Sequence, residues 1–392
     1  MALPAAGHDV SYSSMARLLM LLLAMLALGT PVLAQDRKSC GAPASLDDGW
    51  TVAPPSDVGL DTARLCGLDA FLAQWPQANV HAVVIVRRGK LVYERYYTGA
   101  DERWGRPIGT VEYAPKVKHD LRSISKSTTA LLVGIARGEG KFPDLDSPVI
   151  EQFPQYADLR TPENARITFR HLLTMSSGLK WDESMPYSDP ANSERRLMVA
   201  ADPVRYVFEQ PVIATPGTVY SYNGGNTTLL AAMLAQVTSR RLDDYARDKL
   251  FGPLGINDFE WVNLPTTGEP AAASGLRLRP RDSAKLGQLL LADGQWNGRQ
   301  VLPKGWAAES VKPALNGEGL YYYGYQWWLG RTMLRGRDIV WSAGVGYGGQ
   351  RLYAVPALDL VVMINAGHYG GPLQGAIPFG IFTRFVLPAT KD

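Results

Sequence analysis

The apolar residues in the N-terminal third of the chain follow first a helical and then a strand-like period. Residues 59–75 carry apolar side chains at helical spacing, and two shorter runs, 81–86 and 91–97, are rich in the β-branched and aromatic residues of strands. Arg88 and Gly89 separate the two runs at the length of a tight hairpin loop. The pattern therefore predicts a helix followed by a β-hairpin.

The middle of the chain is predicted to be mostly helical and rich in loops. A helix is expected over residues 124–137, where apolar positions recur at helical spacing, and Gly138 is expected to end it. Within residues 140–270 the clearest helical segments are 167–175 and 227–237.

The C-terminal part of the chain returns to strands. A helix with one apolar face is predicted over 280–293. Strand-like runs follow at 339–343, 351–355 and 358–364, and an apolar helix over 373–386 is predicted to close the chain.

Strands at both ends with helices between them predict an α/β (α+β) fold. We expect one antiparallel sheet formed by both chain ends, flanked by helices, with an inserted, mostly helical lobe. The sheet lobe would comprise about residues 45–120 and 275–392, and the helical lobe about residues 121–274, all within a single domain over 35–392. A cleft between the lobes would be the natural site for a ligand.

The first residues have the layout of a secretory signal peptide. Arg17 precedes the apolar run 18–28, and the small-residue ending Val32-Leu33-Ala34 suits cleavage after Ala34. The apolar run has 11 residues, whereas a membrane span needs about 20. The sequence thus predicts a signal peptide over residues 1–34, a periplasmic or secreted mature protein, and no stable membrane anchor.

The charge balance argues against nucleic acid as a partner. The chain has 40 Lys and Arg against 37 Asp and Glu, a net charge of +3, and no lysine- or arginine-rich cluster. Nucleic-acid binding depends on a basic surface that neutralises phosphates. The sequence therefore gives no support for a nucleic-acid partner, and it leaves the oligomeric state open.

Two cysteines, Cys40 and Cys66, are present, both early in the mature segment. In an oxidising compartment they could pair, which would contribute about 3 kcal/mol if unstrained; two separate thiols are the alternative. Two cysteines alone cannot build a structural zinc site. The histidines that remain after residue 34 show no metal-ligand spacing: His81, His119, His171 and His368.

The candidate chemistry begins at Ser123 and Lys126. At a spacing of three, on a predicted first helical turn, the two side chains lie on the same face and within mutual reach. A lysine that burial keeps uncharged can take the proton of a serine hydroxyl. The alternative is a serine at a helix N-terminus with a solvated lysine one turn later. Ser177 and Lys180 have the same spacing but lie in a glycine turn without an apolar helix after it, so they are predicted to be a loop.

The segments around Ser123 resemble a known enzyme family. Residues 119–127 and 131–136 are similar to the active-serine helix of the serine β-lactamase/penicillin-binding-protein-like hydrolases. The similarity is to the branch of class C β-lactamases, related carboxylesterases and 6-aminohexanoate-dimer hydrolases. Further segments agree with the family in the same order along the chain, namely 171–179, 216–218, 253–256, 280–282 and 346–350. The resemblance therefore spans roughly residues 55–385.

The resemblance implies a second element, Tyr-x-Asn, at Tyr222-Asn223-Gly224. Tyr222 takes the place of the tyrosine, which implies a role as proton carrier between nucleophile and leaving group. The third position is Gly224 instead of asparagine, so the amide that β-lactam-processing relatives use on substrate is missing. Asn223 is a candidate substrate-binding residue. Either Tyr222 or Tyr220 could instead be a packing residue.

The third family element, Lys-Thr-Gly or His-x-Gly on a strand lining the cleft, falls by order on residues 344–348, where no cation is present. The glycines suit a strand edge that substrate approaches closely. We expect the N–H of Val345, with Gly346 beside it, to complete an oxyanion hole with the N–H of Ser123. A glycine-rich turn without chemistry is the alternative. His368-Tyr369-Gly370 matches His-x-Gly by letter, but it lies beyond the last predicted strand.

Taken together, the resemblance implies an exported serine hydrolase that cleaves an ester or amide bond through a Ser123 acyl-enzyme, without cofactor or metal. A carboxylesterase or small-amide hydrolase is favoured because the second and third elements are both altered. A β-lactamase or D-Ala-D-Ala carboxypeptidase and a non-catalytic binding protein derived from the fold are the alternatives. Trp181 and Tyr325 are candidate substrate-facing aromatic residues, with packing as the other possibility.

Overall fold

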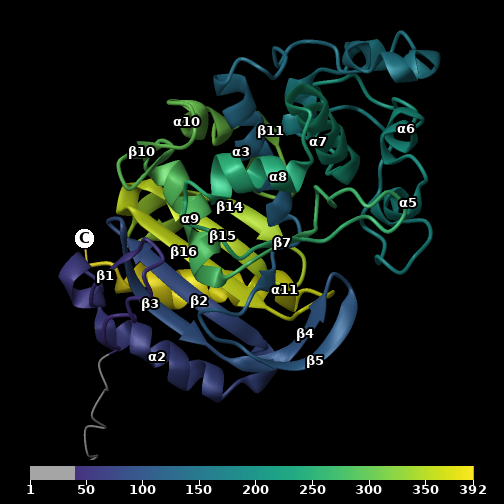
Figure 1. Cartoon of the computed structure of the whole chain (residues 1–392). Coiled ribbons are helices and arrows are strands. Elements are labelled where there is room, and N and C mark those ends of the chain that lie inside the picture. Colours follow the sequence, from purple (N-terminus) through teal and green to yellow (C-terminus); the bar gives the residue numbers. More distant parts are fainter. Residues whose placement is uncertain (1–39, 392) are drawn as a thin grey trace, which may run out of the picture. The chain divides into compact units, whose positions relative to one another are not determined.

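The computed structural model describes residues 40–391, and its centre is a nine-stranded sheet (Figure 1). All neighbouring strands pair antiparallel except β1 and β3, which are parallel. In order across the sheet the strands are β1 (Thr51–Val52), β3 (Lys90–Tyr96), β2 (Val80–Arg87), β16 (Leu360–Ala366), β15 (Gln350–Val355), β14 (Arg337–Gly346), β13 (Trp328–Leu334), β12 (Tyr322–Tyr323) and β11 (Leu315–Asn316). The prediction of one sheet built from both ends of the chain is confirmed. The predicted signal peptide lies outside the described residues.

The predicted hairpin is present and has the expected turn. β2 and β3 are joined by Arg88 and Gly89, whose φ angles are 51° and 69°. Two consecutive positive φ angles are the conformation that matches the twist of the flanking strands in a two-residue loop.

The central strands are buried on both faces. Val86 and Val84 of β2 lie opposite Val361 and Met363 of β16, and these side chains belong to one hydrophobic core. The intervening residues, such as Ile85, belong to a second core on the other face. Strands in this position need apolar side chains at every residue, which is why their sequences show continuous runs instead of alternation.

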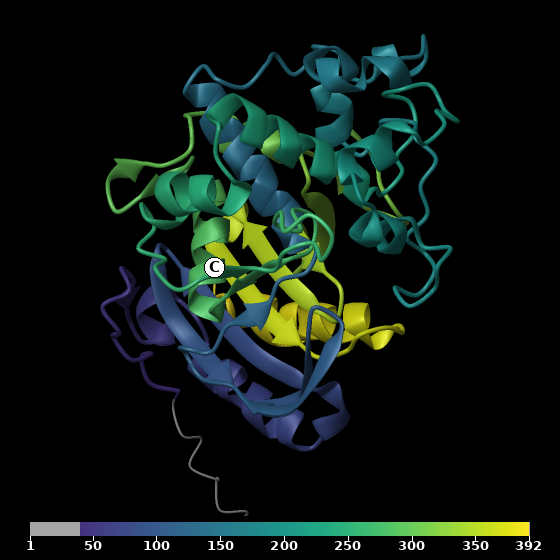
Figure 2. The same cartoon turned by 45° about the vertical axis from the view of Figure 1, so that its right-hand side comes forward.

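Helices cover both faces of the sheet (Figures 1 and 2). α3 (Ile124–Gly138) and α9 (Pro280–Leu291) supply the first core. α2 (Thr62–Ala73), α11 (Leu373–Ile381), the π-helical turn Phe382–Val386 and α12 (Leu387–Ala389) supply the second. The predicted C-terminal helix is thus present as α11 continued by a π-helical turn.

The inserted segment between α3 and α9 is helical and loop-rich, as predicted. Its helices are α4 (Phe169–Leu173), α5 (Ser193–Val199), α6 (Pro203–Phe208), α7 (Gly224–Thr238), α8 (Leu242–Ala246) and the π-helical Arg247–Phe251. Short 3-10 segments lie in the insertion at Ile150–Gln152, Pro154–Leu159 and Asn164–Arg166, and outside it at Pro55–Val58, Pro76–Ala78 and Pro356–Leu358. α10 (Trp306–Ser310) follows α9. α4 is shorter than the predicted helix because the Thr168 side chain caps its start and Met175, with a φ of 55°, lies in the left-handed region after its end.

Three small sheets were not predicted. They are β4 (Thr98–Arg103) with β5 (Arg106–Glu112), β9 (Gln295–Trp296) with β10 (Arg299–Gln300), and β6 (His119–Asp120) with β8 (Leu276–Leu278) and β7 (Glu260–Trp261). β5 is almost wholly exposed and mixes charged residues with proline and glycine, so it lacks a strand pattern. β6 ends three residues before Ser123, and its pairing with β8 fixes the entry of the chain into α3.

A disulfide joins Cys40 to Cys66 of α2. Among residues 40–391 no helix is both long and apolar enough to cross a membrane.

Candidate active site

Ser123 lies in a strained turn directly before α3. It is 9% exposed and its hydroxyl does not cap the helix, so the hydroxyl remains available for other partners. The preceding residue, Arg122, has a φ of 51°, a region in which non-glycine residues are rare. Ser125 holds this turn, because its Oγ donates to the carbonyl of Arg122 at 2.6 Å and accepts from the N–H of Leu276 of β8 at 3.0 Å. Such over-determined strain is common at functional sites.

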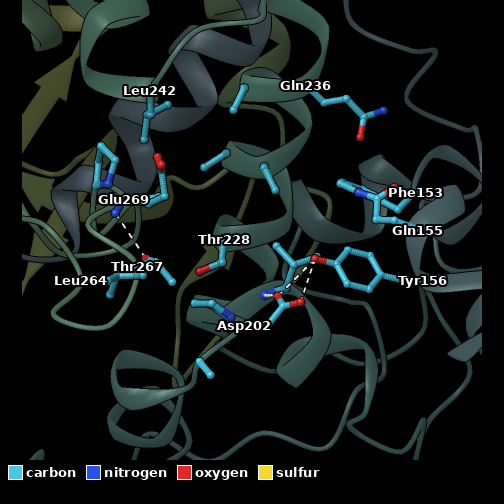
Figure 3. A pocket seen from close by; sticks show the side chains of 18 residues that line it. Phe153, Gln155, Tyr156, Asp202, Thr228, Gln236, Leu242, Leu264, Thr267 and Glu269 are labelled. Carbon is cyan, nitrogen blue, oxygen red and sulfur yellow. Dashed lines mark hydrogen bonds between the residues drawn. The ribbon is translucent and has the colours of Figure 1, made fainter.

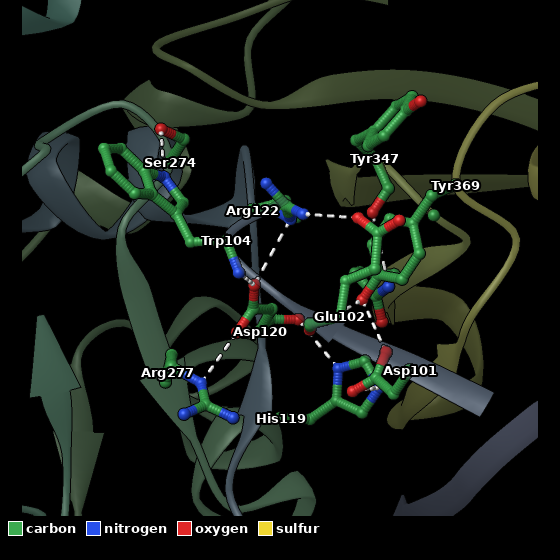
Figure 4. Close-up of polar contacts among 12 residues, drawn as sticks. Asp101, Glu102, Trp104, His119, Asp120, Arg122, Ser274, Arg277, Tyr347 and Tyr369 are labelled. Atoms are coloured by element: carbon green, nitrogen blue, oxygen red, sulfur yellow. Dashed lines mark hydrogen bonds and ion pairs between the residues drawn. The ribbon is translucent and has the colours of Figure 1, made fainter. Parts of the chain in front are cut away.

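Two carboxylates hold the Arg122 side chain in place (Figure 4). Its Nε lies 3.3 Å from Asp120 Oδ2, and its Nη2 lies 3.4 Å from Glu102. Asp120 in turn pairs with Arg277 at 2.7 Å. The buried ion pairs thus tie the turn that carries Ser123 to the β6–β8 sheet.

Lys126 is buried and its amine lies against Ser123. Only 1% of the residue is exposed, and Nζ donates to Ser123 Oγ at 3.1 Å and to the carbonyl of Ala273 at 3.2 Å. No carboxylate of the described residues lies within 4.0 Å of this amine, since Lys126 takes part in none of the ion pairs. The alternative of a solvated lysine one turn into the helix is therefore wrong.

Tyr222 is the third member of the candidate catalytic group, which it forms with Ser123 and Lys126. The Lys126 amine lies 4.7 Å from the centre of its ring, and the ring stacks on Trp328 at 5.9 Å. Burial and the charge of Glu183 raise the pKa of the phenol, while a hydrogen bond with Ser123 acts in the opposite direction. A hydroxyl, an amine and a phenol from two distant parts of the sequence thus meet at one point.

The glycines of β14 allow the strand to lie against the Ser123 turn. A Cβ on Gly346 would be 2.2 Å from the carbonyl oxygen of Leu121, and a Cβ on Gly344 would be 3.1 Å from Ile124. β13 begins at Trp328 opposite Ala343, so that residues 344–346 pair with β15 alone. Within residues 40–391, this stretch of β14 therefore has a backbone edge without a strand partner, beside the candidate nucleophile.

The position of the missing asparagine is occupied by carboxyl groups. A Cβ on Gly224 would be 1.8 Å from Glu194 Oε2 and 3.1 Å from Glu183 Oε1. Glu183 Oε1 accepts from the N–H of Gly224 at 2.6 Å, at the start of α7. Burial and the charge of Glu183 raise the pKa of Glu194 to about 8. Asn223 caps α7 through its Oδ1, which accepts from the N–H of Asn226 at 3.1 Å.

The two predicted aromatic residues lie in different surroundings. Trp181 is 8% exposed, donates to Glu183 Oε1 at 2.7 Å and lies against Gly225 of α7. It therefore packs beside the pair of carboxyl groups formed by Glu183 and Glu194. Tyr325 is 5% exposed, packs on Trp306 and has its hydroxyl engaged by Glu309 and Arg170. Neither has a hydrogen bond with Ser123, Lys126 or Tyr222 among the described residues.

A cavity of about 410 Å³ lies next to Trp328 and Val345, although Ser123, Lys126 and Tyr222 do not line it themselves. It is bounded by Val345 of β14, by Trp328, on which Tyr222 stacks, and by aromatic side chains that include Tyr321 and Phe379. Arg351 also lines it, with Nη1 donating to the carbonyls of Gly346 and Gln350 at 3.1 and 2.9 Å. The cavity is of the size and mainly apolar character of a small-molecule site.

A larger cavity of about 640 Å³ is lined partly by residues of α7, among them Thr228 and Gln236 (Figure 3). Neither Ser123, Lys126 nor Tyr222 lines it. One of its two acidic residues, Asp202, already accepts from the Tyr156 hydroxyl at 3.0 Å and caps α6. This cavity is therefore separate from the candidate active site.

The remaining sequence motifs fall where they were expected. Ser177 is buried in a loop around Gly178, and Lys180 is exposed, so this second Ser-x-x-Lys has no paired amine. His368 follows β16, and its Nε2 bonds to the carbonyl of Ala78 at 2.6 Å. Sequence reasoning missed Glu183, and Glu194 of α5, because no motif links these two carboxylates to Gly224.

Known proteins share both the sequence features and the fold. The sequence profile of the Beta-lactamase family matches residues 68–372. The 6-aminohexanoate-dimer hydrolase of Paenarthrobacter ureafaciens is 27% identical over 300 residues, which cover 71% of this chain and 70% of that protein. The lovastatin esterase of Penicillium rubens is 31% identical over 144 residues, 35% of this chain and 34% of that protein. A solved structure, of a putative 6-aminohexanoate-dimer hydrolase from Bacillus anthracis, matches with a TM-score of 0.65 and 23% identity and covers 80% of each chain.

Proposed function

Because the chain belongs to the beta-lactamase family, whose members are serine hydrolases that form an acyl-enzyme, we propose that Ser123 is its nucleophile and that its substrates are carboxylic esters or small amides. The observation that carries the proposal is the contact between the buried Lys126 amine and Ser123 Oγ at 3.1 Å. The chain is a hydrolase of esters or amides; the roles of single residues and the narrower substrate class are the proposal.

The reaction begins with attack of Ser123 Oγ on the substrate carbonyl. Lys126, in its uncharged form, accepts the hydroxyl proton, and Tyr222 passes a proton to the departing alkoxide or amine. The N–H groups of Ser123 and Val345 stabilise the oxyanion. Water then attacks the acyl-enzyme, and Lys126 and Tyr222 transfer one of its protons to Ser123 Oγ as the acid is released.

Two features favour neutral esters and small amides over β-lactams. Gly224 has no amide, and the carboxyl groups of Glu183 and Glu194 lie in the space that a side chain there would fill. Residues 344–348 supply no cation for a substrate carboxylate, and Nη1 of the nearby Arg351 already donates to the carbonyls of Gly346 and Gln350. Since β-lactam antibiotics and D-Ala-D-Ala peptides carry a carboxylate, both features weaken their binding.

Kinetics with a substrate panel test this proposal. We expect kcat/KM for p-nitrophenyl acetate or butyrate, or for a short ω-amino-acid amide, to exceed that for nitrocefin and for a D-Ala-D-Ala peptide by at least about 100-fold. A difference of this size corresponds to the loss of roughly two polar contacts with the substrate. Ser123→Ala should abolish turnover of every substrate, and Ser177→Ala, the matched control in the second Ser-x-x-Lys, should leave it unchanged. Nitrocefin as the best substrate would overturn the proposed class.

The proposal includes export of the mature chain. It is supported by the signal-like layout of residues 1–34 and by the disulfide between Cys40 and Cys66, since disulfides persist in oxidising compartments. The full chain, expressed in a Gram-negative bacterium, should appear in the periplasmic fraction with Gln35 as its first residue, measured by intact mass. A cytoplasmic protein that retains residues 1–34 would contradict export.

A further inference from the structure

Two imidazoles and a carboxylate meet beneath the Ser123 turn, away from the reacting side chains. His81 of β2, Asp101 of β4 and His119 of β6 are all buried, and one ligand atom of each lies within 4.8 Å of the others. Figure 4 shows Asp101 and His119 next to each other. Because the two histidines are separated by 38 residues, sequence spacing gave no sign of the cluster.

The outer nitrogen of each ring must carry a hydrogen. His119 Nδ1 lies 2.9 Å from the carbonyl of Asp120, which can only accept. His81 Nε2 lies 3.2 Å from Asn79 Oδ1. The Asn79 amide cannot be reversed, since its Nδ2 already donates to the carbonyls of Ala100 at 2.9 Å and Gly367 at 3.2 Å. Both rings are therefore fixed in orientation and tautomer from outside.

When both rings are neutral, the inner nitrogens therefore face each other as lone pairs. His81 Nδ1 and His119 Nε2 are 2.8 Å apart, and the Asp101 carboxylate lies 3.8 Å from the first and 3.6 Å from the second. Three buried Lewis bases with a net negative charge thus converge without a positive charge among the described side chains between them.

We propose that His81, Asp101 and His119 bind a divalent first-row transition-metal ion, with Zn²⁺ as the best candidate. Nitrogens 2.8 Å apart leave room for an ion about 2.0–2.1 Å from both, and opening the pair by about 0.5 Å gives tetrahedral angles. Two imidazoles with one carboxylate suit zinc, cobalt and iron(II). The phenols of Tyr113 and Tyr369 both donate to Asp101, so that further oxygen atoms lie beside the site.

The surroundings preorganise this site. Hydrogen bonds from the outer ring nitrogens to an amide oxygen and a backbone carbonyl are the usual supports of metal-bound histidine. A Cβ on Gly99 would be 2.7 Å from His81 Nε2, and a Cβ on Gly367 would be 2.4 Å from Asn79 Nδ2. The backbone therefore packs closely against the outer side of the His81 ring and against its partner Asn79. The ion would join β2, β4 and β6, the last of which carries Asp120, the partner of Arg122. Its role is to stabilise the support of the Ser123 turn, independently of the proposed catalytic steps.

Metal content and cobalt spectroscopy test the site directly. The mature chain, produced without a histidine tag and dialysed, should hold one Zn²⁺ per chain by elemental analysis. After removal of the metal with a chelator, one equivalent of Co²⁺ should produce visible absorption bands typical of nitrogen and oxygen ligands, and the melting temperature should fall without metal and recover with it.

Variants locate the ion. His119→Gln and Asp101→Asn should weaken Zn²⁺ binding at least about 100-fold, as expected for the loss of a ligand, whereas His171→Gln, outside the cluster, should bind as the unmodified chain does. Absence of both stoichiometric zinc and the cobalt spectrum in the unmodified chain would show that the cluster holds a proton only and would overturn the proposal. Full binding in a folded His119→Gln variant would overturn it as well. If these variants fail to fold, the cobalt titration of the unmodified chain decides.

Discussion

The close approach of β14 to the Ser123 turn predicts a large effect from one methyl group. In Gly346→Ala the new Cβ would be 2.2 Å from the carbonyl oxygen of Leu121 and 2.9 Å from Gln350 Cβ. A carbon and a carbonyl oxygen in contact are normally about 3.3 Å apart, so the strand and the turn must separate by about 1 Å. Both neighbours are backbone or backbone-proximal atoms, which cannot rotate away. Since Leu121 lies two residues before Ser123, the shift moves the nucleophile relative to the proposed oxyanion donor on β14.

A displacement of about 1 Å in a catalytic group costs about 100-fold in rate. We therefore expect kcat/KM of Gly346→Ala for a p-nitrophenyl ester to fall by about 100-fold, mainly in kcat, with a loss of about 1–3 kcal/mol in stability from overpacking. Gly380→Ala is the matched control, because a Cβ there, in α11, meets nothing within 4 Å. Activity of Gly346→Ala within threefold of the control would refute the assignment of β14 to the site.

Three further predictions concern the carboxyl pair, the phenol and the disulfide. Tyr222→Phe should lower kcat about 100- to 10,000-fold with an unchanged melting temperature, as expected for a lost acid/base group; unchanged kcat would exclude the phenol from proton transfer. The raised pKa of Glu194, about 8 against an ordinary 4.5, means that its stabilising contribution is full below pH 4.5 and is lost as the pH rises through 8. Glu194→Gln should therefore flatten the fall in unfolding free energy between pH 5 and 9, measured by urea denaturation, and an equally steep fall would contradict the assignment. Replacing both Cys40 and Cys66 by serine opens a loop of 26 residues and should cost about 3 kcal/mol in unfolding free energy; a loss below about 1 kcal/mol would show that the disulfide contributes little.

The sequence was sufficient to predict those parts of the protein that depend on local patterns. The helix beginning at Ile124 and the hairpin across Arg88 and Gly89 follow from periodicity and from a two-residue loop, and both are present. The pairing of Ser123 with Lys126 also follows from spacing on one helical turn, and the structure places the amine on the hydroxyl.

Features that depend on distant segments could not be predicted. The exposed strand β5 has no apolar alternation, so the β4–β5 hairpin gave no signal. The glycines of β14 were expected to admit substrate, but the structure gives them an additional reason, the contact of Gly346 with Leu121. Glu194 lies 30 residues before Gly224 in the sequence and fills the space beside it, which no spacing rule foresees.

The central claim is that Ser123 carries the acyl group, and trapping that intermediate tests it most directly. The mature chain is mixed with a p-nitrophenyl ester, quenched in acid and digested, and the peptides are analysed by mass spectrometry. We predict one acyl adduct per chain, on the peptide containing Ser123, which is absent in Ser123→Ala and retained in Ser177→Ala. An adduct on another residue, or turnover that persists in Ser123→Ala, would contradict the account.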